Sequence, residues 1–206
     1  YVSDNDITKL PISELSKDAQ TAYDAGAKGV MMFRWGLSNF IDFNKLNTHE
    51  ITPSYGDSVS INSILAASAS LKKYIEDKGV LPKFVTVGNF NYTVPQFLYL
   101  MTKATEGIAN GNLKEITAIL VNASSKTSGD VINKQLVKSE FVSLAKTLSS
   151  YMSANGIAPG NVSSTLGDIK YESLIYAYAR VLSYYQSNSA LPNFVFVTNL
   201  LDNYSL

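Results

Sequence analysis

The chain has 206 residues, which is enough to bury a sizeable core in one domain or in one domain plus a fragment. Its 17 basic and 17 acidic residues cancel, and no basic stripe predicts a nucleic-acid partner. The absence of cysteine excludes disulfides, thiolate catalysis and cysteine-ligated zinc, and the single histidine excludes a multi-histidine metal site.

Residues 1–50 predict a small α/β fragment. Residues 13–25 are expected to form a helix, and residues 29–35 a continuous apolar strand with both faces buried. The stretch 22–35 resembles the last helix and strand of an α/β barrel of the glycan-hydrolase sort. One such pair cannot close a barrel, so the strand either pairs elsewhere or is the remnant of a barrel that was cut away. Residues 51–57, which include a proline and a glycine, are expected to be a linker.

From residue 58 onward one pattern occurs three times. A tyrosine is followed by a proline eight residues later and by a valine three residues after that. Apolar residues ten, seven and three positions before each tyrosine predict one face of a helix that includes the tyrosine itself. Each tyrosine is therefore expected to be a core residue whose hydroxyl reaches a partner at the rim. The three copies begin at Tyr74, Tyr151 and Tyr184.

Each copy is interpreted as an amphipathic helix, a stop, and a proline that turns the chain into an extended segment. Gly79 and Gly156 suit the left-handed position that ends a helix, whereas Ser189 stands there in the third copy and weakens the stop signal. The prolines are expected to be structural because each fixes φ and cannot continue a helix. The predicted structural residues are Tyr74, Gly79, Pro82, Tyr151, Gly156, Pro159, Tyr184 and Pro192.

A second self-match lies between these copies. It relates residues 88–101 to residues 167–178, aligning Tyr92 with Tyr171 and leaving two extra residues in the first copy. The predicted fold of residues 58–206 is therefore mainly α, a series of helix, Pro-hook and helix units with short extended segments. Such units gain stability by stacking on one another.

These residues carry a family resemblance. The order Tyr-Ile/Met-x-x-Asn/Lys-Gly-x-Leu/Ala-Pro-x-x-Val, followed by Phe/Leu-Leu/Ile-Tyr on the next helix, resembles the pseudomurein-binding repeat over about residues 58–200. That family occurs in surface proteins and wall-lytic enzymes of methanogenic archaea and their viruses. Residues 81–87 and 191–197 fit the pattern, whereas residues 158–164 lack the aromatic residue and the second valine. The resemblance implies a module that binds the pseudomurein cell wall.

Glycan contacts are expected near the hooks and the glycine turn, where aromatic and amide side chains fall outside the helical stripe. Carbohydrate sites combine a flat aromatic face with fixed amide and hydroxyl groups. The alternative is that the hook phenylalanines are buried, since they alternate with other residues along the extended segments. The candidate glycan-binding residues are Lys83, Phe84, Asn89, Asn91, Tyr92, Tyr171, Asn193 and Phe194.

No catalytic or metal-binding residue is predicted. His49 has no strained Gly-x-Ser-x-Gly nucleophile turn to serve and is interpreted as a solvated linker histidine. The lytic relatives of the pseudomurein-binding family pair the repeats with a thiol peptidase, and this chain has no cysteine to act as its nucleophile. The acids in or near the barrel-like part form no paired cluster for glycoside hydrolysis: Asp24, Asp42, Glu50 and Asp57.

The expected function is a non-catalytic module that anchors a larger archaeal surface or viral protein to the pseudomurein wall, outside the cell. Charged residues are 17% of the chain, which predicts a neutral, hydrogen-bonding surface suited to an uncharged glycan. No cofactor and no membrane span are expected. The chain lacks an initiator Met and a signal peptide, so it is expected to be a piece of a longer precursor.

Two alternatives remain open at this point. In the first, the chain is the targeting part of a wall glycan hydrolase or peptidase. In the second, it is a structural adhesin or filament subunit that associates with itself. Release of reducing sugar from sacculi distinguishes the first alternative from binding, and light scattering across concentration distinguishes the second.

Overall fold

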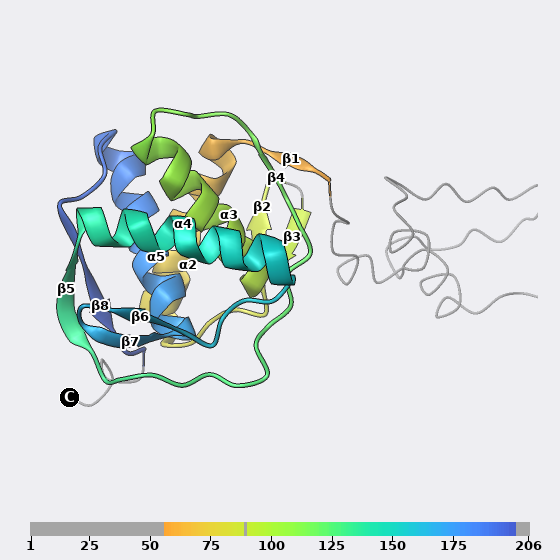
Figure 1. Cartoon of the computed structure of the whole chain (residues 1–206). Helices are drawn as coiled ribbons and strands as arrows, with labels where there is room; N and C mark the ends of the chain where they lie inside the picture. The colour runs from red at the N-terminus through yellow and green to blue at the C-terminus, as the bar shows by residue number, and fades with distance from the viewer. Residues whose placement is uncertain (1–55, 89, 201–206) are drawn as a thin grey trace, which may run out of the picture. The chain divides into compact units, whose positions relative to one another are not determined.

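A computed structural model describes residues 56–88 and 90–200 of the chain (Figure 1). The α/β fragment expected at residues 1–50, with its resemblance to a barrel, lies outside the described residues. So does most of the linker expected at residues 51–57, and so does Asn89, one of the candidate glycan-binding residues.

In the described part the chain forms helices and short strands in alternation. The strands make four antiparallel pairs, β1–β4, β2–β3, β5–β8 and β6–β7. The elements in order are β1 (Ser58–Val59), α2 (Ile61–Lys78), β2 (Phe84–Val87), β3 (Phe90–Thr93), α3 (Val94–Ala109), β4 (Ile116–Thr117), β5 (Asn133–Val137), α4 (Lys138–Asn155), β6 (Asn161–Ser164), β7 (Gly167–Lys170), α5 (Tyr171–Asn188) and β8 (Phe194–Thr198).

This content corrects the predicted fold class. Helices take 49% and strands 22% of the described residues, so the fold is mixed α/β and not mainly α. The segments after the prolines, predicted as short extended segments with no pairing assigned, are paired strands. The helices form a central group and the strand pairs lie around them (Figure 1). Within that group α2 packs on α5, and α3 packs on both α4 and α5.

The two halves of this part have the same order of elements and the same pairing. The first half is β1-α2-β2-β3-α3-β4 and the second is β5-α4-β6-β7-α5-β8. In each half the first strand pairs with the last, and the two inner strands form a hairpin. The elements α2, β2, β3 and α3 begin at positions 61, 84, 90 and 94, each 77 positions before the starts of α4, β6, β7 and α5 at 138, 161, 167 and 171.

This constant spacing corrects the second self-match. Tyr92 of β3 corresponds to Ile169 of β7, and both side chains are buried. Tyr171 corresponds to Val94, because each is the first residue of a helix. Both hairpins have two residues between their strands, so the two extra residues of the sequence alignment do not exist in the structure. The glycine that suggested the alignment, Gly167, is the first residue of a strand.

The recurring tyrosines are at the surface, which corrects the expectation that they belong to the core. The residue after each one faces inward: Ile75 and Met152 are buried, and Tyr185 packs against the core. The buried stripe of α2 advances by four residues from Leu71 to Ile75, whereas the predicted stripe advanced by three. The exposed fractions are 40% for Tyr74, 45% for Tyr151 and 46% for Tyr184.

Helices α2, α4 and α5, which precede the three prolines, end in the same way. Gly79, Gly156 and Ser189 have φ values of 71°, 65° and 52°, in the left-handed region, and each donates its backbone N–H to the carbonyl four residues before it. The serine ends α5 where the weaker stop signal stood, although a side chain makes that conformation less favourable than it is for glycine. The three prolines each stand two residues before the strand that follows.

Candidate functional site

A groove of about 480 Å³ lies between the C-terminal part of α5 and strand β8, with Lys72 of α2 also in its lining. We call it the α5–β8 groove. Helix α5 contributes Arg180, Ser183 and Tyr184, and the segment that follows the helix contributes Asn193 and both exposed phenylalanines of β8. The groove is positioned by the helix stop, since the turn after α5 brings β8 back along the helix, and α5 and β8 are in contact.

Three aromatic side chains line the groove. Along β8, Val195 and Val197 are buried, so the strand's alternation directs Phe194 and Phe196 to the other face. These two side chains are 43% and 39% exposed, and their rings meet edge to face with centroids 5.8 Å apart. Tyr184 is the third. The groove therefore offers accessible aromatic surface, and the alternative that Phe194 is a core residue does not hold.

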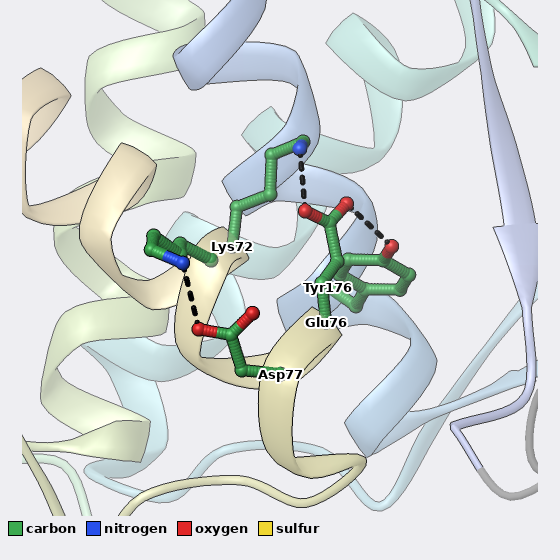
Figure 2. A network of polar contacts seen from close by, with 5 residues as sticks. Lys72, Glu76, Asp77 and Tyr176 are labelled. Atoms are coloured by element: carbon green, nitrogen blue, oxygen red, sulfur yellow. Dashed lines mark hydrogen bonds and ion pairs between the residues drawn. The ribbon is translucent and has the colours of Figure 1, made fainter.

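A charged network joins α2 to α5 beside the groove. Lys72 Nζ lies 2.7 Å from Glu76 Oε2, and the Tyr176 hydroxyl donates to Glu76 Oε1 at 3.0 Å (Figure 2). The Arg180 guanidinium lies 5.1 Å from the centroid of the Tyr176 ring, and its Nη1 donates to the Phe196 carbonyl at 3.3 Å. These contacts connect two helices and a strand through side chains.

Glu76 is held in its charged form by this network. Partial burial opposes ionisation, but the hydrogen bonds from Lys72 and Tyr176 and the positive charges of Lys72 and Arg180 outweigh it, so the pKa of Glu76 lies below its ordinary value. Glu76 itself does not line the groove. No acidic residue of the described chain does, whereas two cationic residues do.

The predicted glycan-binding residues do not form one site. Of the seven that the structure describes, Asn193 and Phe194 line the α5–β8 groove. Lys83, Phe84 and Asn91 belong to the β2–β3 hairpin or the turn before it. The remaining two are Tyr92 and Tyr171.

The hairpin residues interact with one another. Lys83 Nζ lies 5.2 Å from the centroid of the Phe84 ring, and Thr86 Oγ1 donates to Asn91 Oδ1 at 2.8 Å. The equivalent pair in the second half, Ser163 and Asp168, makes the same cross-strand bond at 2.6 Å. Because this bond recurs at equivalent positions, it is explained by the pairing of the strands.

Tyr92 and Tyr171 are buried, so the expectation that they present a face to a sugar is corrected. Tyr92 stands on the inward side of β3, and burial together with the nearby charge of Asp57 raises the pKa of its phenol to about 12. Tyr171 begins α5, and its side chain enters the core. Both were expected near the hooks and the glycine turn, outside the helical stripe, whereas Tyr92 lies in β3 and Tyr171 is the first residue of α5.

Sequence reasoning also missed residues of the groove. Tyr184 was assigned to the core, and Lys72 and Arg180 belonged to no motif. Phe196 lies in the matched segment 191–197 but was not named as a glycan contact. A stripe continued by four residues from Val181 to Tyr185 leaves Tyr184 outside, and this signal was available in the sequence. No signal in the sequence predicted that Lys72 lines the same groove as Arg180, because this depends on how α2 packs on α5.

A second hollow, of about 460 Å³, lies beside the start of α2. Its lining includes Leu113, Glu115 and Tyr185. It has an acid and a single aromatic residue, so it lacks the aromatic pair and the cations of the α5–β8 groove.

Two further observations bear on the kind of site. Within residues 56–88 and 90–200, no three His, Asp or Glu side chains are grouped so that they could hold a metal ion. None of the helices in the same part of the chain has the length and apolar character needed to cross a bilayer.

No protein-family model matches the chain, and no curated protein matches it either.

Proposed function

We propose that this chain is a non-catalytic module that binds a cell-wall glycan, pseudomurein, and attaches a larger archaeal surface or viral protein to the wall from outside the cell. The observation that carries the proposal is the α5–β8 groove. The resemblance to the pseudomurein-binding repeat is the reason for naming that polymer.

The composition of the groove suits a sugar chain. Tyr184, Phe194 and Phe196 offer apolar ring faces on which the C–H face of a sugar can stack. Asn193 and Ser183 add amide and hydroxyl groups that can donate and accept hydrogen bonds. Except for Asn193, which directly precedes β8, these groups are mounted on a helix and a paired strand. They are therefore fixed in position before a ligand arrives, which lowers the entropy lost on binding.

We further propose that the described part of the chain is an internal duplication of a β-α-β-β-α-β unit. The support is the spacing of 77 positions from α2, β2, β3 and α3 to α4, β6, β7 and α5, and the pairing of the first strand with the last and of the two inner strands in each half. Corresponding positions also agree in burial, as with Ile64 and Phe141 on the first helices and Phe97 and Leu174 on the second. This replaces the predicted series of three units by two, because the third copy of the motif lies on the helix that corresponds to α3.

Binding is tested by sedimentation with isolated cell walls. The full chain is mixed with sacculi from a pseudomurein-walled archaeon or from a murein-walled bacterium, and the bound fraction is measured. We expect the archaeal sacculi to pull the chain down at moderate salt, and the bacterial sacculi to do so less well. Recovery of the chain in the supernatant with both kinds would contradict the proposal.

A matched pair of variants locates the binding surface in the same assay. Tyr184→Ala removes an aromatic ring from the groove, and Tyr151→Ala removes an almost equally exposed tyrosine that lies at the same distance before the end of α4, outside the groove. We expect the first to lose about tenfold in affinity, as for removal of an aromatic stacking contact, and the second to bind as the parent does. Equal losses would assign binding to another surface.

A further inference from the structure

We infer that the two halves of the described part pack on each other as the subunits of a symmetric dimer do, and that each half can take its counterpart from a second copy of this chain. The partner is therefore another copy of the chain. The contact surface is the helical face that joins the halves. The inference rests on the internal packing of the molecule and goes beyond the proposed function.

The helices pack between the halves more than within them. The largest helix contacts join α2 of the first half to α5 of the second, and α3 of the first half to α4 of the second. Within the first half α2 meets α3 through fewer residues, and α4 meets α5 through fewer still. The strand pairs, in contrast, form within each half. A half on its own would therefore leave its helices without most of their packing.

The contacts between the halves have the pattern of a twofold axis. In an interface of this kind, when one element of a subunit contacts a second element of its partner, the reverse contact exists as well. Here α2 corresponds to α4 and α3 to α5, so the α2–α5 and α4–α3 contacts are one kind of contact formed twice. The corresponding helices α3 and α5 also pack on each other, as an element does when it lies at the axis.

The same positions are buried on the helices of both contacts. Leu71 of α2 and the corresponding Leu148 of α4 are buried, and so are Leu98 of α3 and the corresponding Ile175 of α5. Each half thus presents to the other a face that resembles the one it receives. A surface that fits its own likeness within one chain also fits it in a second copy.

The α5–β8 groove is built across this interface. Lys72 belongs to the first half, whereas Ser183 and the rest of the α5 and β8 lining belong to the second. The corresponding positions, Ser149 and Glu106, meet between α4 and α3, where Ser149 Oγ donates to Glu106 Oε2 at 3.2 Å. After an exchange of halves, Lys72 of one copy would complete the groove of the other, and a dimer would carry two such grooves.

The chain passes from one half to the other over a short stretch. The Ile119 carbonyl accepts a hydrogen bond from Gln96 of the first half. The Asn122 N–H already donates to the Gly156 carbonyl of the second half at 2.9 Å. Only residues 120–121 lie between, and we call them the crossing. An exchange changes the path of the chain there and keeps the contacts between the halves, so protein concentration decides between the two forms.

Mixing two defective copies of the full chain tests the exchange. Leu98→Asp puts a charge at a fully buried position of the first half, and Ile175→Asp does so in the second, so each chain alone is expected to be unfolded. The two are unfolded together in urea and refolded. We expect about half of the parent's helical circular dichroism to return, with a dimer in light scattering, because one of the two pairs of halves is intact. No return of signal on mixing overturns the inference.

A matched mixture provides the control. Leu98→Asp is refolded with Phe97→Asp, a chain damaged at another buried residue of α3, so that no intact first half is present. We expect no return of helical signal in this mixture. Equal recovery in the two mixtures would show that it does not come from paired halves, and this also overturns the inference.

The parent chain gives a second measurement that needs no defective variant. Refolding at increasing protein concentration is expected to yield a growing fraction of dimer, which persists on dilution because the halves must unfold before they separate. Deletion of the exposed Leu120 shortens the crossing and is expected to lower the concentration at which dimer and monomer are equal by about tenfold. Deletion of the exposed Thr127, beyond the crossing, is the control and is expected to leave it unchanged. A parent that is monomeric at every concentration, or equal effects of both deletions, overturns the inference.

These experiments contain no glycan, so they fail separately from the proposed function. If the chain binds sacculi but never exchanges halves, wall binding stands and this inference is wrong. If the chain exchanges halves but binds no sacculi, this inference stands and wall binding is wrong.

Discussion

Tyr178 and Tyr171 place two phenol groups in the same core, and their hydroxyls have different surroundings. The Tyr178 hydroxyl donates to the Phe141 carbonyl at 2.8 Å, and burial raises the pKa of this phenol. The Tyr171 hydroxyl is also buried, but it has no hydrogen-bond partner among the described residues. Burial of a polar group lowers stability unless a partner compensates for the lost water.

This contrast predicts opposite effects of the same substitution. Tyr178→Phe removes a satisfied hydrogen bond and is expected to lower the free energy of unfolding by about 1 kcal/mol. Tyr171→Phe removes an unsatisfied hydroxyl and is expected to leave that free energy unchanged or to raise it. Urea denaturation of both variants measures the effects. A loss in Tyr171→Phe as large as that in Tyr178→Phe would show that its hydroxyl has a partner.

Single residues also show where the sequence was informative. Gly79 and Gly156 were expected in the left-handed position, and they have it, because few other residues adopt positive φ at so little cost. The tyrosines three residues after an apolar position were expected in the core and are exposed. A helix has 3.6 residues per turn, so gaps of three and four both fit a stripe locally. Packing against a neighbouring helix decides between them.

Among the elements, α2 and α5 are connected by Glu76. This carboxylate interacts with Lys72 on its own helix and with Tyr176 on α5, and its pKa lies below the ordinary value of 4.5 (Figure 2). A carboxylate with a lowered pKa in the folded state stabilises the fold above its unfolded pKa. That stabilisation is lost as the pH falls through the folded pKa.

Glu76→Gln is therefore expected to change the pH dependence of stability. The parent chain is expected to lose stability as the pH falls below the ordinary value of 4.5 and through the lower pKa of the folded Glu76 carboxyl. The variant is expected to lose less over this range because residue 76 no longer takes up a proton. The free energy of unfolding at a series of pH values measures this. Asp77→Asn is the control, since it breaks the exposed Lys73–Asp77 pair, which contributes little. Parallel acid profiles for the parent and Glu76→Gln would contradict the role given to Glu76.

The elements differ in how far they could be predicted. The helices before the three prolines followed from apolar periodicity and from helix-stop residues, which are local signals. The pairing of β1 with β4 and of β5 with β8 left no such signal, because short strands with more than fifty residues between them meet only when the helices pack. The fold class was therefore expected to be mainly α, and the strands make it mixed.

At the scale of the whole molecule, similar halves have different surfaces. The buried faces of corresponding helices agree, while the positions beside α5 and α3 differ in charge and aromatic content. Under the proposed duplication, both halves keep the residues that fold the unit, and the surface of one half is free to change. The repeated sequence motif was enough to predict Asn193 and Phe194 as binding residues. Lys72 could not be predicted in this way, because it lines the groove from α2, a helix more than a hundred residues earlier in the chain.

The central claim is that the α5–β8 groove binds wall glycan. Its most direct test is the mapping of backbone amide chemical shifts of the isotope-labelled full chain as soluble fragments of pseudomurein glycan are added. We expect the largest changes at residues 180–196 and small changes at residues 103–117, which belong to the corresponding elements α3 and β4 and the segment between them. Changes confined to the β2–β3 hairpin, changes of equal size in both halves, or no changes at all would contradict the claim.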